Sequence, residues 1–148
     1  MQNPIDAADV LALEWDAVLA HRGDASTVAQ VKDRFIVHGV TPEAVAAALR
    51  DGGSGIAAAA ASGREDWAAP YGGFLAVALI AAEVAAYSSH LVARASAVRS
   101  VAVDALLEDF SAVSVAGELG VSRQKVYEIA RDSAKRRASI ARGHDRPF

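Results

Sequence analysis

The sequence predicts an all-α protein, a helical bundle with a long, apolar central helix and two short helices near its C-terminal end. Three observations predict this fold. Apolar residues make up 53% of the 148 residues, and much of that share is Ala, the best helix former. Only four Pro interrupt the chain, and apolar residues recur at helical spacing between Gly-containing breaks. A chain of this size and apolar content can bury a core.

Composition also restricts the class of protein. The chain has no Cys, which excludes disulfides, zinc–cysteine sites and thiol catalysis, and is typical of a reducing cytoplasm. The N-terminal residues lack the basic region and apolar run of a secretion signal. We therefore expect a cytoplasmic protein.

Three helices are expected in the first fifty residues, because apolar positions repeat at helical spacing and Gly23 and Gly39 interrupt the pattern. Thr41 followed by Pro42 is a typical helix start. The helices are predicted to run from Asn3 or Asp6 to about His21, from about Ala25 to His38, and from Pro42 to about Arg50.

Two aromatic side chains and one capping pattern add detail to this region. Trp15 and Phe35 lie within apolar faces, so we expect both in the core. A surface on which bases stack is the weaker alternative, because the region is acidic. Thr27 and Gln30 have the spacing of a capping box for the second helix.

Gly-rich and mixed segments connect this region to the central helix. Residues 51–55 are predicted to form a turn or hinge, since a phosphate-binding loop needs a preceding strand and none is predicted. A short helix is expected from Ile56 to Ala61. Residues 62–73 read as a loop, in which Trp67 and Tyr71 either pin the loop to the core or contact a partner.

The segment from Phe74 to about Val98 is apolar on almost every side. Such a helix is expected to be buried, either at the centre of the bundle or in a dimer interface. The uncharged run of residues 67–82 is too short and too interrupted by Pro and Gly for a membrane span. A further helix is predicted over residues 101–110, beginning at Ser96 or Ser100, and whether a bend precedes it stays open.

The segment from Val115 to Ile129 predicts two short helices that share a small core. Val115, Leu119, Val126 and Ile129 are apolar at helical spacing on both sides of a break. Gly120 suits the turn because Gly adopts a left-handed backbone conformation without steric cost. Ser122 follows, and a Ser at this position caps the free amides of the next helix.

The polar side chains that remain on the outer face of the second helix suit a DNA groove. Arg and Gln make paired hydrogen bonds to base edges, and Lys and Arg neutralise phosphates. This helix is predicted to continue through the basic residues 135–137 to Gly143. The predicted DNA-binding residues are Ser122, Arg123, Gln124, Lys125, Tyr127, Arg131, Lys135, Arg136 and Arg137.

This segment resembles the helix-turn-helix of bacterial and phage transcription regulators. Ala116, Gly120 and Val126 match its pattern of a small residue, a Gly and an aliphatic residue, and residues 119–126 are especially similar. Gly117 is a departure from this pattern, because Gly inside a helix costs about 1 kcal/mol of stability relative to Ala. The resemblance covers roughly residues 112–132, and it implies sequence-specific DNA binding with the helix from Ser122 in the major groove.

Charge is distributed unevenly along the chain, whose net charge is −3. Residues 1–90 contain five Lys or Arg and eleven Asp or Glu, a net charge of −6. Residues 120–148 contain eight Lys or Arg and three Asp or Glu, a net charge of +5. We therefore expect an acidic helical body, residues 1–98, and a DNA-binding region with a basic tail, residues 99–148.

No residue pattern predicts catalysis, a cofactor or a metal site. His21, His38, His90 and His144 fall in separate segments, without the helical pairing of metal ligands. Adjacent acidic residues such as Glu65 and Asp66 diverge by about 100° on a helix. We expect a protein that is not an enzyme; an enzyme acting on DNA would need acidic metal ligands that the sequence does not suggest.

These observations predict a repressor-like transcriptional regulator that binds double-stranded DNA. A homodimer through the Phe74–Val98 helix is expected, because one short helix reads few base pairs. The alternative is an antitoxin or phage regulatory protein that acts mainly by protein–protein contact through its acidic N-terminal body.

Overall fold

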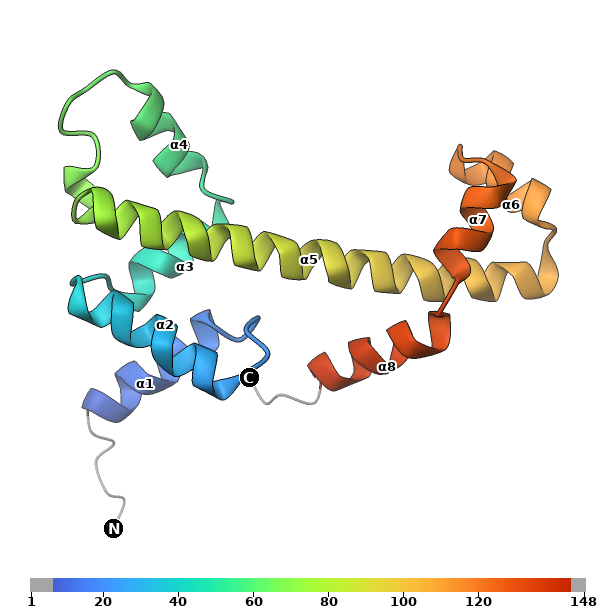
Figure 1. Ribbon diagram of the computed structural model, residues 1–148, viewed down its shortest axis with the longest axis horizontal. Helices are drawn as coiled ribbons and strands as arrows, with labels where there is room; N and C mark the ends of the chain where they lie inside the picture. Colours follow the sequence, from blue (N-terminus) through green and yellow to red (C-terminus); the bar gives the residue numbers. More distant parts are fainter. Residues whose placement is uncertain (1–6, 145–148) are drawn as a thin grey trace, which may run out of the picture. The chain divides into compact units, whose positions relative to one another are not determined.

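The computed structural model describes residues 7–144, and in this range all regular structure is helical, which confirms the predicted all-α class (Figure 1). The predicted start of the first helix at Asn3 or Asp6 and the C-terminal residues 145–148 lie outside the described residues. The helices are α1 (Ala7–Val18), α2 (Ala25–Val37), α3 (Pro42–Arg50), α4 (Ser54–Ala61), α5 (Phe74–Asp109), α6 (Ala112–Leu119), α7 (Arg123–Ala130) and α8 (Ser133–His144), with one 3-10 turn, η1 (Ala69–Tyr71).

The chain divides into two compact units, Met1–His90 and Leu91–Phe148, and the division falls inside α5. The predicted boundary between residues 98 and 99 falls in the same helix. Each unit has its own apolar core, one around α1, α2, α3 and the first half of α5, the other around the end of α5, α6 and α7.

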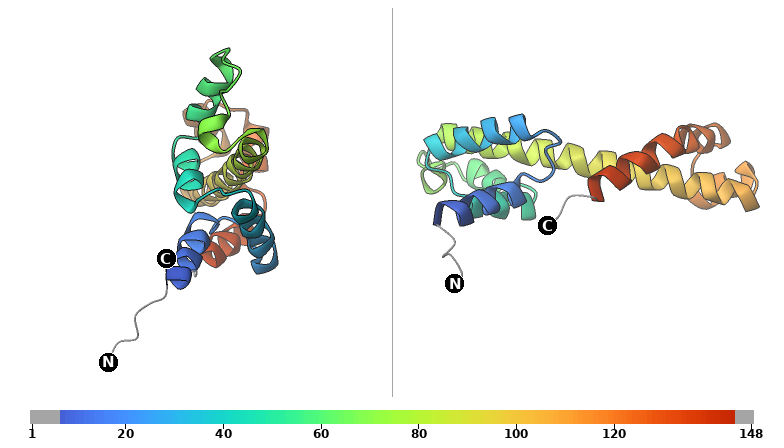
Figure 2. Two further views of the ribbon diagram at one scale, coloured as in Figure 1. Left: turned by 90° about the vertical axis from the view of Figure 1, so that its left-hand side faces the viewer. Right: turned by 90° about the horizontal axis from the view of Figure 1, so that it is seen from below.

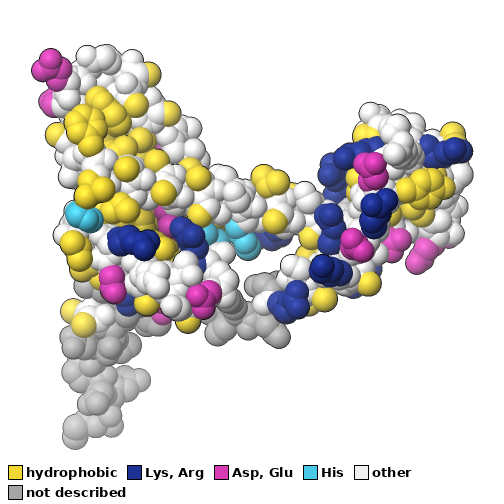
Figure 3. Space-filling model, in the orientation of Figure 1, with side chains coloured by type: hydrophobic (Ala, Val, Ile, Leu, Met, Phe, Trp, Pro, Cys, Tyr) yellow, Lys and Arg dark blue, Asp and Glu magenta, His cyan; other side chains and the backbone are white. Residues whose placement is uncertain are grey.

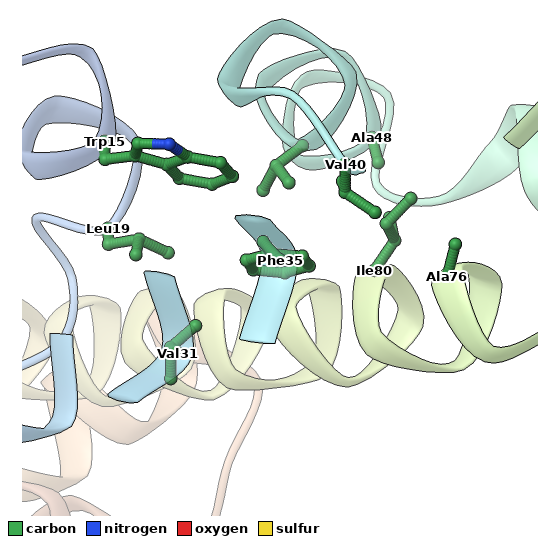
Figure 4. Close-up of a cluster of buried hydrophobic side chains, with 9 residues drawn as sticks. Trp15, Leu19, Val31, Phe35, Val40, Ala48, Ala76 and Ile80 are labelled. Atoms are coloured by element: carbon green, nitrogen blue, oxygen red, sulfur yellow. The ribbon is translucent and has the colours of Figure 1, made fainter. Parts of the chain in front are cut away.

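The core of the first unit forms where α1, α2 and α3 pack against the first half of α5 (Figures 1 and 2). Trp15 stacks on Phe35 with ring centroids 5.4 Å apart, and Ile80 reaches the same cluster from α5 (Figure 4). Trp15 is 3% exposed and Phe35 1%. The prediction that both are core residues is confirmed, and neither offers a face on which a base could stack.

Side-chain caps account for where these helices begin. Asp24 caps α2 and accepts hydrogen bonds from the backbone N–H groups of Ser26 and Thr27, at 3.4 and 3.2 Å. The predicted capping box of Thr27 and Gln30 is therefore wrong, because the helix begins before Thr27. Thr41 caps α3 as predicted, with Oγ1 accepting from Ala44 N–H at 3.2 Å.

The connection between α3 and α5 is a turn, a short helix and a loop. Asp51 organises the turn, because its carboxylate accepts hydrogen bonds from the N–H groups of Gly53 at 2.8 Å and Gly55 at 3.1 Å. The short helix α4 starts at Ser54, slightly earlier than predicted. The Trp67 ring meets the Phe74 ring edge-on at 5.5 Å, so Trp67 holds the loop against the start of α5.

One uninterrupted helix, α5, spans 36 residues from Phe74 to Asp109. No bend separates residues 74–98 from 101–110, and the predicted helix start at Ser96 or Ser100 is wrong because both residues lie inside α5. The segment contains neither Gly nor Pro, so nothing in its sequence ends the helix.

The prediction that this helix is buried on all sides is wrong for the single chain. Phe74, Leu75, Val92 and Val98 are 64%, 55%, 67% and 52% exposed, because the neighbouring helices do not cover these sides of α5. By length and composition alone, α5 is the one helix among residues 7–144 that could cross a membrane. The Pro and Gly residues that argued against a span precede its first residue.

Candidate nucleic-acid interface

Two eight-residue helices, α6 and α7, pack on each other and on the end of α5. Their shared core contains Val115 and Ala116 from α6, Val126 and Ile129 from α7, and Val103 from α5. Val126 is 0% exposed and Val115 5%. Leu119, which the sequence placed in this core, is 42% exposed, because it lies at the end of α6 on the side of Leu106 and Phe110.

The turn between α6 and α7 has the residues that its geometry requires. Gly120 has φ 67° and ψ 34°, the left-handed region that favours Gly, and its N–H bonds to the carbonyl of Ala116. Ser122 Oγ then accepts a hydrogen bond from Lys125 N–H at 3.1 Å, and so caps α7. Ser111 caps α6 in the same way, with Ser114 N–H at 3.1 Å.

The outward face of α7 carries the predicted contact residues. Arg123, Gln124, Lys125 and Tyr127 are all exposed, and Tyr127 is 55% exposed although it is aromatic. Glu128 lies beside Lys125, with Oε2 3.7 Å from Nζ. Ser122 differs from the others because its hydroxyl is engaged in the cap, so it orients the helix.

The prediction that this helix continues to Gly143 is wrong, because α7 ends at Ala130. Arg131 has an extended backbone with ψ 138°, and Asp132 has φ 62°, the one non-Gly residue with positive φ among the described residues. A new helix, α8, begins at Ser133. Lys135, Arg136 and Arg137 therefore lie on a separate helix; Lys135 and Arg137 are exposed, and Arg136 is half-buried.

Two side chains of α5 fix the joint between α7 and α8. Ser100, fully buried, donates a hydrogen bond from Oγ to the Arg131 carbonyl at 3.4 Å. Ser133 Oγ donates to Asp104 Oδ2 at 2.6 Å. The sequence did not predict these contacts of Ser100 and Asp104, because their partners are 31 and 29 residues away in the chain.

Charges of opposite sign occupy different elements of this second unit. Residues 100–119, the end of α5 and all of α6, contain four Asp or Glu and no Lys or Arg, a net charge of −4. Residues 120–144 contain seven Lys or Arg and two Asp or Glu, a net charge of +5. Figure 3 shows Lys and Arg side chains gathered over this unit. A polyanion would therefore be attracted to α7 and α8 and repelled by α6.

A buried ionic cluster in the first unit was not predicted from the sequence, in which Glu83 directly follows the uncharged run of residues 67–82. Glu83, 1% exposed, accepts hydrogen bonds from Arg22 Nε at 3.0 Å and Nη2 at 2.8 Å, and pairs with His21 Nε2 at 2.5 Å. A charge within an apolar helix was the available signal, but its partners are 61 and 62 residues away.

The charge state of this cluster follows from its contacts. Burial raises the pKa of Glu83, but the hydrogen bonds from His21 and Arg22 and the positive charge of Arg22 outweigh burial and lower the pKa to about 2. The hydrogen bond to Glu83 in turn raises the pKa of Arg22. The cluster ties the α1–α2 turn to α5, and its charged groups serve this structural contact.

Among the side chains that the structure describes, no three His, Asp or Glu lie close enough together to hold a metal ion. Comparison with family models, with curated proteins and with solved structures found no match to this chain.

Proposed function

We propose that the protein is a sequence-specific DNA-binding regulator of transcription, repressor-like in its mode of binding, that inserts α7 into the major groove. One observation carries the proposal. The capped helix α7 buries Val126 and Ile129 against α6 and leaves Arg123, Gln124 and Tyr127 exposed on its other side. A short, firmly packed helix with such an outer face is what base-edge recognition requires.

The contact residues divide between the two basic helices. Arg123 and Gln124 occupy the first turn of α7, from which a helix entering the groove reaches base edges, and both residue types bond bases in pairs. Lys125, Arg131, Lys135, Arg136 and Arg137 contact phosphates. Because the chain bends at residues 131–132, α8 does not extend α7. It forms a second basic element that lies along the phosphate backbone of the DNA.

A homodimer on a two-fold site accompanies this proposal, because a helix of eight residues reads few base pairs. The interface is the first two-thirds of α5, residues 74–98. Its exposed Phe74, Val92 and Val98 provide the apolar surface that association requires.

The experiment selects DNA from a random pool with the full chain and then compares two Arg→Ala variants on selected and unselected DNA. Arg123→Ala should bind both DNAs similarly, losing about 1–3 kcal/mol of discrimination. Arg64→Ala removes the same charge from an exposed ion pair in the acidic unit and serves as the matched control, with unchanged discrimination. Affinity should fall steeply with salt for all three proteins.

One result would contradict the proposed role of α7. If Arg123→Ala keeps full preference for the selected DNA, α7 is not the reading helix and the proposal fails. Arg137→Ala should weaken binding to both DNAs equally and make the salt dependence shallower, as expected for a phosphate contact.

A second candidate function is protein–protein contact, as in an antitoxin or phage regulatory protein. It is favoured by exposed apolar side chains in the acidic unit, where Ile36 is 53% and Val37 76% exposed. No retention on DNA at low salt, together with a protein that co-purifies and is lost in the Val37→Glu variant, would favour this function over DNA binding.

A further inference from the structure

The second unit carries an apolar groove that the proposed DNA contacts do not use. The groove lies between the end of α5 and α6, has a volume of about 320 Å³, and is lined by Leu106, Phe110, Ser114, Val115, Glu118 and Leu119. Leu106, Phe110 and Leu119 are 40%, 56% and 42% exposed. Three large apolar side chains open to solvent around one groove are typical of a contact site.

The charge around this groove is negative. Glu118 is its one charged lining residue, and Asp109 directly precedes Phe110. Residues 100–119 contain no Lys or Arg, so no cation within this stretch neutralises the carboxylates. The groove therefore repels a polyanion and attracts a positively charged partner.

Two arrangements with a second copy of the chain fit the groove poorly. A symmetric contact of groove with groove would bring two negatively charged surfaces together, each with Glu118 in its lining, and contact between like charges is unfavourable. The basic helix α8 has the right charge, but its exposed side chains include only Ala at apolar positions, while Ile140 is half-buried. Such a helix presents no large, exposed apolar side chain with which to fill the groove.

We propose that this groove binds an amphipathic helix of another protein, with large aliphatic side chains on one face and Lys or Arg beside them. The aliphatic side chains pack between Leu106, Phe110 and Leu119, and the cations pair with Glu118 and Asp109. The proposal does not depend on DNA binding, since the groove and the basic residues of α7 and α8 belong to different elements. If both hold, the protein can engage DNA and a basic protein partner at once.

The test measures binding of two synthetic peptides to the full chain by fluorescence anisotropy. Both peptides are about four helical turns long and carry Leu at positions i, i+4 and i+7. One has Lys at the flanking positions and the other has Glu. We expect the Lys peptide to bind at least about tenfold more tightly at low salt, and the difference to shrink as salt is added.

Three variants locate the binding. Leu119→Ser should weaken the Lys peptide about tenfold, and Glu118→Lys should reverse the preference between the peptides. Val113→Ser is the matched control, because Val113 is 65% exposed on the same helix but does not line the groove. Glu118 is exposed, so its replacement tests the proposal even if Leu119→Ser unfolds α6.

Several outcomes overturn the proposal. Equal affinity for the two peptides would show nonspecific apolar binding, and no saturable binding of either would show that the groove takes no helix. If Val113→Ser weakened binding of the Lys peptide as much as Leu119→Ser does, the peptide would bind outside the groove. A peptide of residues 133–144 that binds as tightly as the Lys peptide would assign the groove to a second copy of the chain.

Discussion

At the scale of single residues, Glu83 is a charged side chain buried within the first unit. Removing a carboxylate from water costs several kcal/mol, and only close, well-oriented partners offset that cost. Arg22 supplies two hydrogen bonds and a charge, and His21 completes the set. Because the His21 and Glu83 side chains are only 3% and 2% exposed, the contact is poorly screened by salt.

The Glu83 cluster predicts how stability depends on pH. The folded-state pKa of Glu83, about 2, lies below its ordinary value of 4.5. The stabilisation is therefore complete above about pH 4.5 and is lost as the pH falls toward 2; the difference corresponds to about 3 kcal/mol. Glu83→Gln should lower the free energy of unfolding by about 3 kcal/mol at pH 7 and flatten its decline in acid, measured by urea unfolding.

Asp66→Asn is the control for this prediction, because Asp66 pairs with Arg64 on the surface, where the two side chains are 67% and 74% exposed. It should cost less than about 1 kcal/mol. A Glu83→Gln protein whose stability declined in acid as steeply as that of the unmodified chain would contradict the assignment of the low pKa.

Single residues also show what sequence reasoning can reach. Trp15 and Phe35 were predicted as core residues, because each sits on an apolar helical face and large aromatics on such faces are usually buried. Glu83 could not be placed, since the residues that satisfy it are brought close only by tertiary packing. The prediction that Leu119 lies in the core was wrong, because helical spacing shows on which face of a helix a residue lies but not how far the neighbouring helices extend along that face.

At the scale of elements, local chemistry decides boundaries in some places and packing in others. Thr41 and Ser122 cap α3 and α7 as the sequence predicts, because a cap acts on the next few amides. The break after α7 has no Gly or Pro to announce it. Ser100 and Ser133 tie this joint to α5, and Asp132 takes up the positive φ.

The turn between α6 and α7 can be tested with two Gly residues that lie three positions apart. Neither Gly117 nor Gly120 has an atom within 4 Å of an added Cβ, so backbone conformation alone decides the effect. Gly120→Ala should destabilise the protein by about 1–2 kcal/mol, because φ is +67°. Gly117→Ala lies inside α6 and should stabilise it by up to about 1 kcal/mol.

Thermal and urea unfolding of the two Gly variants measure this difference. The changes in the free energy of unfolding should have opposite signs for the two variants. If Gly120→Ala displaces α7, this variant should also bind the selected DNA more weakly. Equal and small effects of both substitutions would mean that the turn does not depend on the left-handed conformation of Gly120.

At the scale of the whole molecule, the all-α class could be predicted because Ala richness, helical spacing and scarce Pro all point to it. The burial of α5 could not, because an apolar sequence shows what a helix would exclude from water but not what covers it. Within the single chain, only 22% of an apolar stretch of 18 residues in α5 is buried. The exposed remainder is what a second copy would cover in the proposed dimer.

That dimer predicts a measurable mass and a sharp mutational response. The unmodified chain should sediment at about twice its 15.3 kDa at micromolar concentration, and its melting temperature should rise with concentration, because association stabilises the folded state. Val92→Glu places a charge on the exposed apolar side of α5 and should give a monomer whose melting temperature no longer depends on concentration. Ile36→Glu makes the same change at a 53% exposed position of α2 and should leave the mass unchanged. A monomeric unmodified chain, or a dimer broken by Ile36→Glu and not by Val92→Glu, would exclude α5 as the interface.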